Sequence, residues 1–169
     1  SDWSSDVCSS DLGGVIPDTL YMDTAESIVA LLLHIREETG VELDQISFNE
    51  PDLGVNVRMG SEATVDFIRI AGPMLDKAGL KTKFLIGDVS QPSPTTQYMD
   101  VLLGATDIAP WLGDISYHSW NSSTMSDGLL SAIRKKAALI DKTLIIGEFG
   151  YNPGLWKTPE EFPDRKSVV

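Results

Sequence analysis

Apolar residues recur at helical spacing in four segments of the chain. Within residues 24–39 they repeat at i, i+3, i+4 and i+7, the spacing that places side chains on one face of a helix. The residues that carry this pattern are Ile28, Leu31, Leu32 and Ile35, and Gly40 follows as a typical helix end. The same criterion predicts further helices over residues 62–78, roughly 96–108 and 127–141.

Short apolar runs lie between these helical segments and predict strands. They cover residues 41–48, 83–88, 114–120 and 143–149. The second run contains Phe84, Leu85 and Ile86 in succession, which is typical of a parallel strand buried on both faces. Strands that alternate with helices predict an α/β fold, in which crossover helices join the strands of a parallel sheet.

The spacing of these units leaves two architectures open. Glu50 follows the first predicted strand and Glu148 lies near the end of the fourth, at about 33 residues per unit, close to the ~30 expected of a βαβ unit. Residues 13–163 therefore suit either a small doubly wound sheet or a piece of a (β/α)8 barrel, roughly five units of a ~250-residue whole.

Composition and charge exclude several classes of protein. The chain has 169 residues, of which 42% are apolar and 22% charged, as is ordinary for a globular domain. It contains no run of about 18 apolar residues, so we expect no membrane span. The net charge of −12 argues against a nucleic-acid partner, because proteins that bind nucleic acids present a basic surface. Cys8 is the single cysteine, so no disulfide or thiolate metal site forms within the chain.

The two ends of the chain differ from its middle. Residues 1–12 and 164–169 have no apolar periodicity and resemble translated sequencing-adapter read-through, so we leave them out of the fold prediction. A native disordered terminus is the alternative. The predicted domain is residues 13–163, and its sequence does not indicate where the protein resides.

Polar and aromatic side chains stand at the end of every predicted strand. Because the carboxyl ends of parallel strands meet at one edge of a sheet, we expect these side chains to share a site. The residues are Asn49, Glu50, Asp88, Tyr117, His118, Trp120 and Glu148.

Two glutamates at one sheet edge favour glycoside hydrolysis. One carboxyl group must be protonated to assist the leaving oxygen, while the other is ionised and attacks the anomeric carbon or activates water. Sugar rings also pack their C–H faces on aromatic side chains. Four aromatic residues near or after the strand ends are candidates for that contact: Tyr117, Trp120, Tyr151 and Trp156.

Three segments, ISFNEPD, ISYHSW and LIIGEFG, resemble strand ends four, six and seven of the clan A retaining β-glycosidases, which include cellulase-like family 5 and families 30 and 39. The resemblance implies a partial (β/α)8 barrel, about strands four to seven, that acts on a carbohydrate without a metal or organic cofactor. It implies that Glu50 is the acid/base, Glu148 the nucleophile and Asn49 the partner of the sugar 2-hydroxyl. The clan usually carries His-x-Tyr on strand six, whereas this chain has His118-Ser119-Trp120, so the support of Glu148 stays open.

Other interpretations stay open beside this one. Glu50, Asp88, His118 and Glu148 are also a ligand set that suits a divalent metal, as in metal-dependent barrel hydrolases and isomerases. A third alternative is an inactive carbohydrate-binding remnant. Asp88 is expected to contact a sugar hydroxyl or to cap a helix. His118 is expected to bind substrate, to orient a carboxylate or to be a buried core histidine, and His34 is predicted to lie on the surface.

Overall fold

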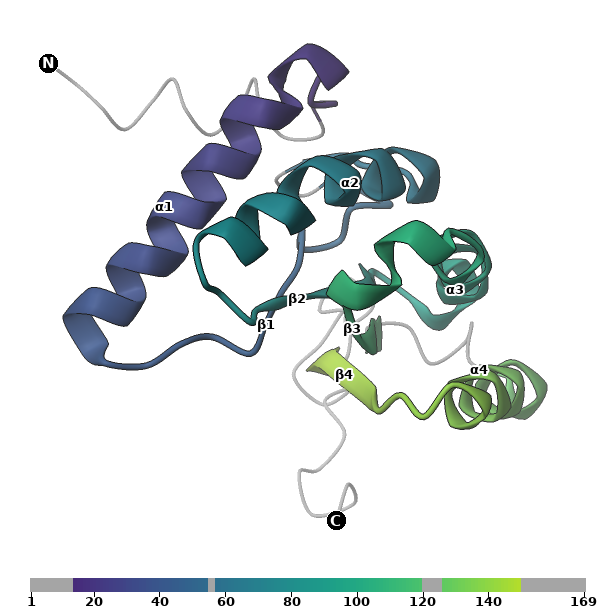
Figure 1. Ribbon diagram of the computed structural model, residues 1–169. Helices are drawn as coiled ribbons and strands as arrows, with labels where there is room; N and C mark the ends of the chain where they lie inside the picture. The colour runs from purple at the N-terminus through teal and green to yellow at the C-terminus, as the bar shows by residue number, and fades with distance from the viewer. Residues whose placement is uncertain (1–13, 55–56, 120–125, 150–169) are drawn as a thin grey trace, which may run out of the picture.

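Four parallel strands form one sheet in the order β1-β2-β3-β4 in the computed structural model, which describes residues 14–54, 57–119 and 126–149. Helices connect consecutive strands and lie outside the curled sheet (Figure 1). With η for a short 3-10 helix, the elements are η1 (Asp18–Leu20), α1 (Tyr21–Thr39), β1 (Gln45–Ile46), α2 (Ser61–Lys77), β2 (Lys83–Val89), α3 (Pro92–Gly104), η2 (Thr106–Trp111), β3 (Leu112–Ser119), α4 (Asp127–Leu139) and β4 (Leu144–Phe149).

The architecture is a partial (β/α)8 barrel and not a small doubly wound sheet. In a doubly wound sheet, helices cover both faces, whereas here they form a single outer layer (Figure 1). The carboxyl ends of all four strands therefore point to the same end of the half-barrel, where barrel enzymes carry their active sites.

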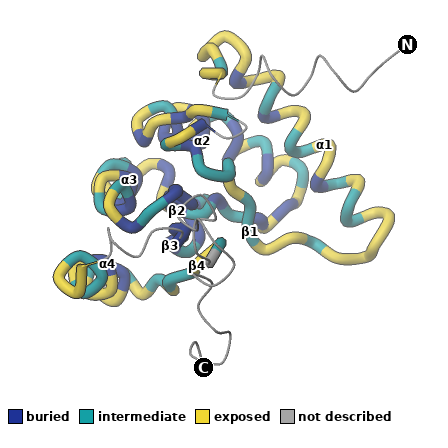
Figure 2. Tube along the Cα trace, turned by 180° about the vertical axis from the view of Figure 1, so that it is seen from behind, coloured by how far each residue is buried: buried dark blue, intermediate teal, exposed yellow. Residues whose placement is uncertain are grey.

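The apolar core lies between the helices and the outer face of the sheet. Phe67 of α2 is fully buried there, and its ring meets those of Tyr21, Phe48 and Phe84 edge-on, at centroid distances of 5.7, 5.2 and 6.0 Å. Edge-to-face contacts of this kind add to the gain from burying the rings. Figure 2 shows the same division along the helices, with exposed positions on their outer sides. The apolar core between the helices and the sheet thus stabilises the curved arrangement of the strands.

The helical pattern predicted the end of α1 correctly, but the helix begins at Tyr21, earlier than the predicted residue 24, and part of its buried face was misplaced. Gly40 ends the helix in a left-handed conformation with φ 71°, as predicted. Leu31 is a correction, because it is 57% exposed while Tyr21, Ala25 and Leu32 are buried. No helix within the described ranges combines the length and the apolar character that crossing a membrane requires.

The first strand is much shorter than the predicted 41–48. Only Gln45–Ile46 pair with β2, and the apolar side chains of Val41 and Leu43 are exposed instead of buried. The carbonyl of Leu43 accepts a hydrogen bond from the Thr82 hydroxyl, so a side chain takes the place of a ladder bond. The apolar residues Val41 and Leu43 thus lie at the surface before the strand and are not part of it.

The third helix begins and ends earlier than the predicted 96–108. It spans Pro92–Gly104, because proline is well suited to the first position of a helix, where its missing N–H has no partner to lose. Pro110 does not end this helix but lies inside the short η2 that follows.

Candidate active site

A tight turn after β1 places Glu50 at the mouth of the half-barrel. Glu50 adopts a left-handed backbone conformation with φ 47°, which is uncommon for a residue with a side chain and often marks a functional position. Its N–H donates to the carbonyl of Asp88 at 3.0 Å, and its carbonyl accepts from the N–H groups of Leu53 and Gly54. The turn is thereby fixed to the end of β2.

Two further contacts hold the loop that follows Glu50. The carboxylate of Asp52 accepts from the N–H and the hydroxyl of Ser90, at 2.9 and 2.6 Å. The hydroxyl of Tyr98 in α3 donates to the carbonyl of Met59 at 2.7 Å. Burial, helped by the negative charge of Asp52, raises the pKa of Tyr98 to about 12, so this hydroxyl keeps its proton at neutral pH. The position of the loop is therefore fixed by its contacts with Ser90 and α3 as well as by the turn at Glu50.

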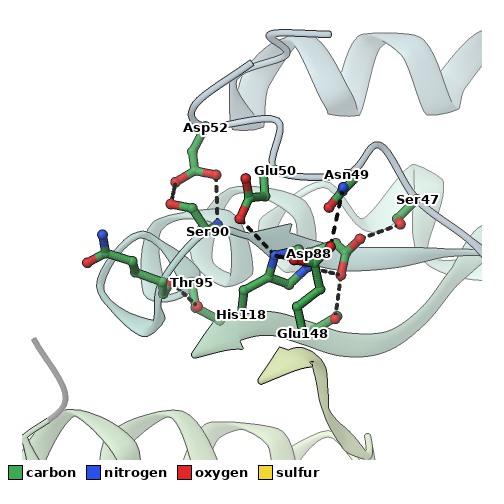
Figure 3. Close-up of polar contacts among 11 residues, drawn as sticks. Ser47, Asn49, Glu50, Asp52, Asp88, Ser90, Thr95, His118 and Glu148 are labelled. Atoms are coloured by element: carbon green, nitrogen blue, oxygen red, sulfur yellow. Dashed lines mark hydrogen bonds and ion pairs between the residues drawn. The ribbon is translucent and has the colours of Figure 1, made fainter. Parts of the chain in front are cut away.

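His118 lies at the centre of the site, on β3, with its side chain only 2% exposed. Its Nδ1 lies 2.9 Å from Oε1 of Glu50 and 3.6 Å from Oε2 of Glu148. Its Nε2 lies 3.4 Å from Oδ1 of Asp88. Figure 3 shows the imidazole among these three carboxyl groups, which come from the turn after β1, from β2 and from β4. His118 is therefore buried, as one interpretation predicted, and it also belongs to the polar cluster.

Asp88 lies beside Nε2 of His118 and is held by two hydroxyl groups. Ser116 donates to its Oδ1 and Ser47 to its Oδ2, each at 2.6 Å, and Figure 3 shows the contact with Ser47. Distances this short are typical of a hydroxyl that donates to an ionised carboxylate. Asp88 also has a left-handed backbone, with φ 56°. Its side chain does not cap a helix, because the N-cap of α3 is Gln91.

Glu148 lies at the end of β4 and is the more accessible of the two glutamates. Its side chain is 38% exposed, against 12% for Glu50. The amide of Asn49 donates to its Oε1 at 3.4 Å, and His118 approaches its other oxygen. One oxygen of Glu50, one of Glu148 and a ring nitrogen of His118 all lie within 4.8 Å of one another. The two glutamates thus face one another across a short gap.

The structure brings five of the predicted site residues into this cluster and places a sixth elsewhere. Together lie Asn49, Glu50, Asp88, His118 and Glu148. Tyr117 precedes His118 on β3 and belongs to the buried core, and burial raises the pKa of its hydroxyl. Trp120, Tyr151 and Trp156 lie outside the described residues.

Sequence patterns missed the serines that support the cluster. Ser116 stands two positions before His118 on β3, and alternate residues of a strand share a face, so this spacing was an available signal. Ser47 and Ser90 meet their aspartates only through the arrangement of the fold. Within the described part of the chain, no buried side-chain nitrogen or oxygen lacks a hydrogen-bond partner. The supporting network is therefore complete where the structure describes it.

The same cluster has the composition of a metal-binding group. Glu50, His118 and Glu148 each offer one ligand atom, and these atoms are close enough to hold a single ion. Imidazole and carboxylate ligands suit Zn²⁺ and related divalent ions. Asp88 is less suited to join them, since both of its oxygens accept short hydrogen bonds from serines.

Comparison with solved structures identifies the class of fold. Over 81% of its length the chain superposes on an endo-β-1,6-glucanase, BT3312, with a TM-score of 0.68 and 22% identity. Over 82% of its length it superposes on SrfJ from Salmonella typhimurium, with the same TM-score and identity. The chain corresponds to 31% and 32% of those two structures, about a third of each. The chain thus shares the fold of about a third of each of these two structures.

Sequence comparison adds no family to this result. No family model matches the chain, and no curated protein matches it.

Proposed function

We propose that the chain is part of a retaining β-glycosidase related to clan A, in which Glu148 is the nucleophile and Glu50 the acid/base. The observation that supports this most directly is the pair of glutamates at the carboxyl ends of β1 and β4, with one oxygen of each within 4.8 Å of the other. Retaining enzymes place their two carboxyl groups about 5–5.5 Å apart, whereas inverting enzymes leave about 6.5–9.5 Å for a water molecule. The short gap supports the retaining mechanism.

The assignment of the two glutamates follows the resemblance to clan A and gives each of them one role in a two-step reaction. In the first step Glu148, the more exposed, attacks the anomeric carbon while the bond to the leaving oxygen breaks, and Glu50 transfers its proton to that oxygen. In the second step Glu50 removes a proton from water, and the water oxygen displaces Glu148 from the sugar. Glu50 thereby regains its proton and the cycle closes.

Other predicted residues are proposed to bind the sugar. The contact of Asn49 with Glu148 supports the proposal that the Asn49 amide binds the 2-hydroxyl of the sugar. His118 is proposed to line the same subsite beside the two glutamates. The aromatic residues Trp120, Tyr151 and Trp156 remain candidate platforms for sugar rings, whereas Tyr117 is buried in the core and is no longer proposed for that role.

The proposed substrate is a β-linked glycan. This proposal extends to the present chain the kind of substrate for which BT3312, an endo-β-1,6-glucanase, is named. Residues 13–163 are proposed to be part of a larger catalytic domain, because the chain spans about a third of both matched structures.

Hydrolysis of aryl β-glycosides and of β-1,6-, β-1,4- and β-1,3-linked glucans tests the proposal. Activity is measured for the 169-residue chain and for a longer product that includes the neighbouring coding sequence. Glu50→Ala and Glu148→Ala should each lower kcat by at least about 100-fold, in line with the loss of an acid/base or a nucleophile. Binding of oligosaccharides without hydrolysis by either form would instead favour a carbohydrate-binding remnant.

A metal-dependent hydrolase or isomerase is the second candidate, favoured by the grouping of Glu50, His118 and Glu148. Dialysis against a chelator followed by addition of Zn²⁺, Mn²⁺ or Mg²⁺ separates the two candidates. A glycosidase of the proposed kind keeps its activity through dialysis, whereas a metal-dependent enzyme loses it and regains it with one of the ions.

A further inference from the structure

We propose that Asp88 is a positioning residue that keeps a proton on Nε2 of His118, so that Nδ1 of His118 holds the carboxyl group of Glu50 in place for proton transfer. This rests on the proposed role of Glu50 as the acid/base. It adds a second layer to the site, made of Asp88 with Ser47 and Ser116, which lies beside Nε2 of His118.

The first step of the argument concerns the charge of Asp88. Two serine hydroxyls donate to its two oxygens at 2.6 Å, and its side chain is 11% exposed. Short bonds from two hydroxyls to both oxygens fit an ionised carboxylate that accepts from every neighbour. A negative charge beside a ring nitrogen favours a proton on that nitrogen. The nitrogen in that position is Nε2 of His118, at 3.4 Å.

The second step concerns the other ring nitrogen. Nδ1 of His118 lies 2.9 Å from Oε1 of Glu50, which is hydrogen-bond distance. The state of one ring nitrogen is set by the partner of the other, so a proton fixed on Nε2 frees Nδ1 to accept. In the neutral ring, the proton of this hydrogen bond therefore belongs to Glu50. That is the proton an acid needs before it meets the leaving oxygen.

The third step concerns what surrounds the ring. The titratable groups that face His118 are Glu50 from the turn after β1, Asp88 from β2 and Glu148 from β4. The backbone of Gly147 packs closely against Asp88 and His118. A Cβ added at Gly147 would lie 2.8 Å from Oδ1 of Asp88 and 3.2 Å from Cδ2 of His118. The imidazole ring is thus closely packed at Nε2, on the side of Asp88, and its Nδ1 faces the two glutamates.

The protonation of the two ring nitrogens is measured directly by ¹H–¹⁵N NMR of the imidazoles near neutral pH. The chain has only two histidines, and His34→Gln removes the signals of the exposed one. Nε2 is the ring nitrogen that couples to both carbon-bound ring protons. We expect it to be protonated in the wild-type chain, and an unprotonated Nε2 overturns the proposal without any substitution in the site.

Asp88→Asn tests the cause of that state. Asparagine removes the negative charge and offers an NH2 donor beside Nε2, so we expect the proton to move to Nδ1. Asp114→Asn is the matched control, because Asp114 is also a partly buried carboxylate that accepts two hydrogen bonds, from Gln45 and from Thr143, but at the start of β3. It should leave the His118 signals unchanged. An Nε2 that stays protonated in Asp88→Asn contradicts the proposal.

Leaving-group dependence tests the effect on Glu50. For Asp88→Asn, kcat/KM should fall about 10- to 100-fold with a phenyl β-glycoside, whose leaving group needs a proton. It should fall less than about threefold with a 2,4-dinitrophenyl β-glycoside, whose leaving group does not. An equal loss on both substrates indicates a purely structural role and overturns the proposal. Absence of turnover by the wild type is a failure of the glycosidase function and leaves the NMR result to decide the state of His118.

Discussion

Glu50 and Glu148 are 98 positions apart in the sequence, yet one carboxylate oxygen of each lies within 4.8 Å of the other. Three αβ units separate them along the chain, and the curvature of a four-stranded sheet brings them together. His118, which lies on β3, contacts both glutamates. The chemistry proposed for this chain depends on that meeting of β1, β3 and β4 at one end of the half-barrel.

Gly147 is predicted to be required for the packing of the cluster. A Cβ at this position would lie 2.8 Å from Asp88 Oδ1 and 3.1 Å from Ser116 Oγ, both closer than atoms normally approach. Gly147→Ala should therefore lower the free energy of unfolding by about 1–3 kcal/mol, as overpacking usually does. Urea unfolding followed by circular dichroism measures the change.

Gly128→Ala is the matched control for this substitution. A Cβ there meets nothing within 4 Å, and Gly128 lies in the first turn of α4. Alanine should stabilise the chain by up to about 1 kcal/mol, because it reduces the freedom of the unfolded backbone. Equal stability of the two variants would show that the space beside Gly147 is not restricted.

The contact between Asp52 and Ser90 is predicted to keep the Glu50 turn closed. Ser90→Ala removes a hydroxyl that donates to the carboxylate at 2.6 Å, and hydrogen bonds to charged groups contribute about 1.5–3 kcal/mol. We expect faster amide exchange at Glu50, whose N–H bonds to Asp88. Ser93→Ala, at an exposed position of α3, is the control and should leave that rate unchanged. Unchanged exchange in Ser90→Ala is the result against this prediction.

Tyr98 is predicted to make the chain sensitive to alkaline pH. Burial raises its pKa from 10.0 to about 12, so the folded state favours the neutral hydroxyl. The stability from this shift is fully present below pH 10 and is lost as the pH rises through 12, by up to roughly 2–3 kcal/mol.

Comparison of Tyr98→Phe with the wild type isolates this contribution from the titration of lysines. At pH 7 the variant should be about 1 kcal/mol less stable, because it lacks the hydrogen bond to Met59. Between pH 10 and 12 the difference should shrink and then reverse in sign. A difference that stays constant over this range would mean that Tyr98 titrates alike in both states.

The strands that carry the candidate site could be predicted because their apolar runs are short and end in polar residues. Phe84 and Ile86 are buried in β2, and Glu148 stands at the end of a similar run. The first strand was overestimated, since Val41 and Leu43 are apolar but exposed. Hydrophobic pattern alone does not distinguish a strand from an apolar segment that lies on the surface.

The glutamates could be predicted from the sequence, but their supporting residues could not. A glutamate at a strand end is unusual enough to be noticed, whereas Ser47 and Ser116 are of a residue type found throughout the chain. Their meeting with Asp88 depends on strand register and on its left-handed backbone, with φ 56°. Neither quantity is readable from residue types.

Covalent trapping of the glycosyl-enzyme tests the central claim most directly. The chain, and the longer product that includes its neighbouring coding sequence, are incubated with a 2,4-dinitrophenyl 2-deoxy-2-fluoro-β-glycoside and digested for mass spectrometry. We predict that one sugar is attached through an ester to Glu148 and that Glu148→Gln is not labelled. A label on another residue, or hydrolysis of the unfluorinated substrate with inversion at the anomeric carbon, would contradict the account.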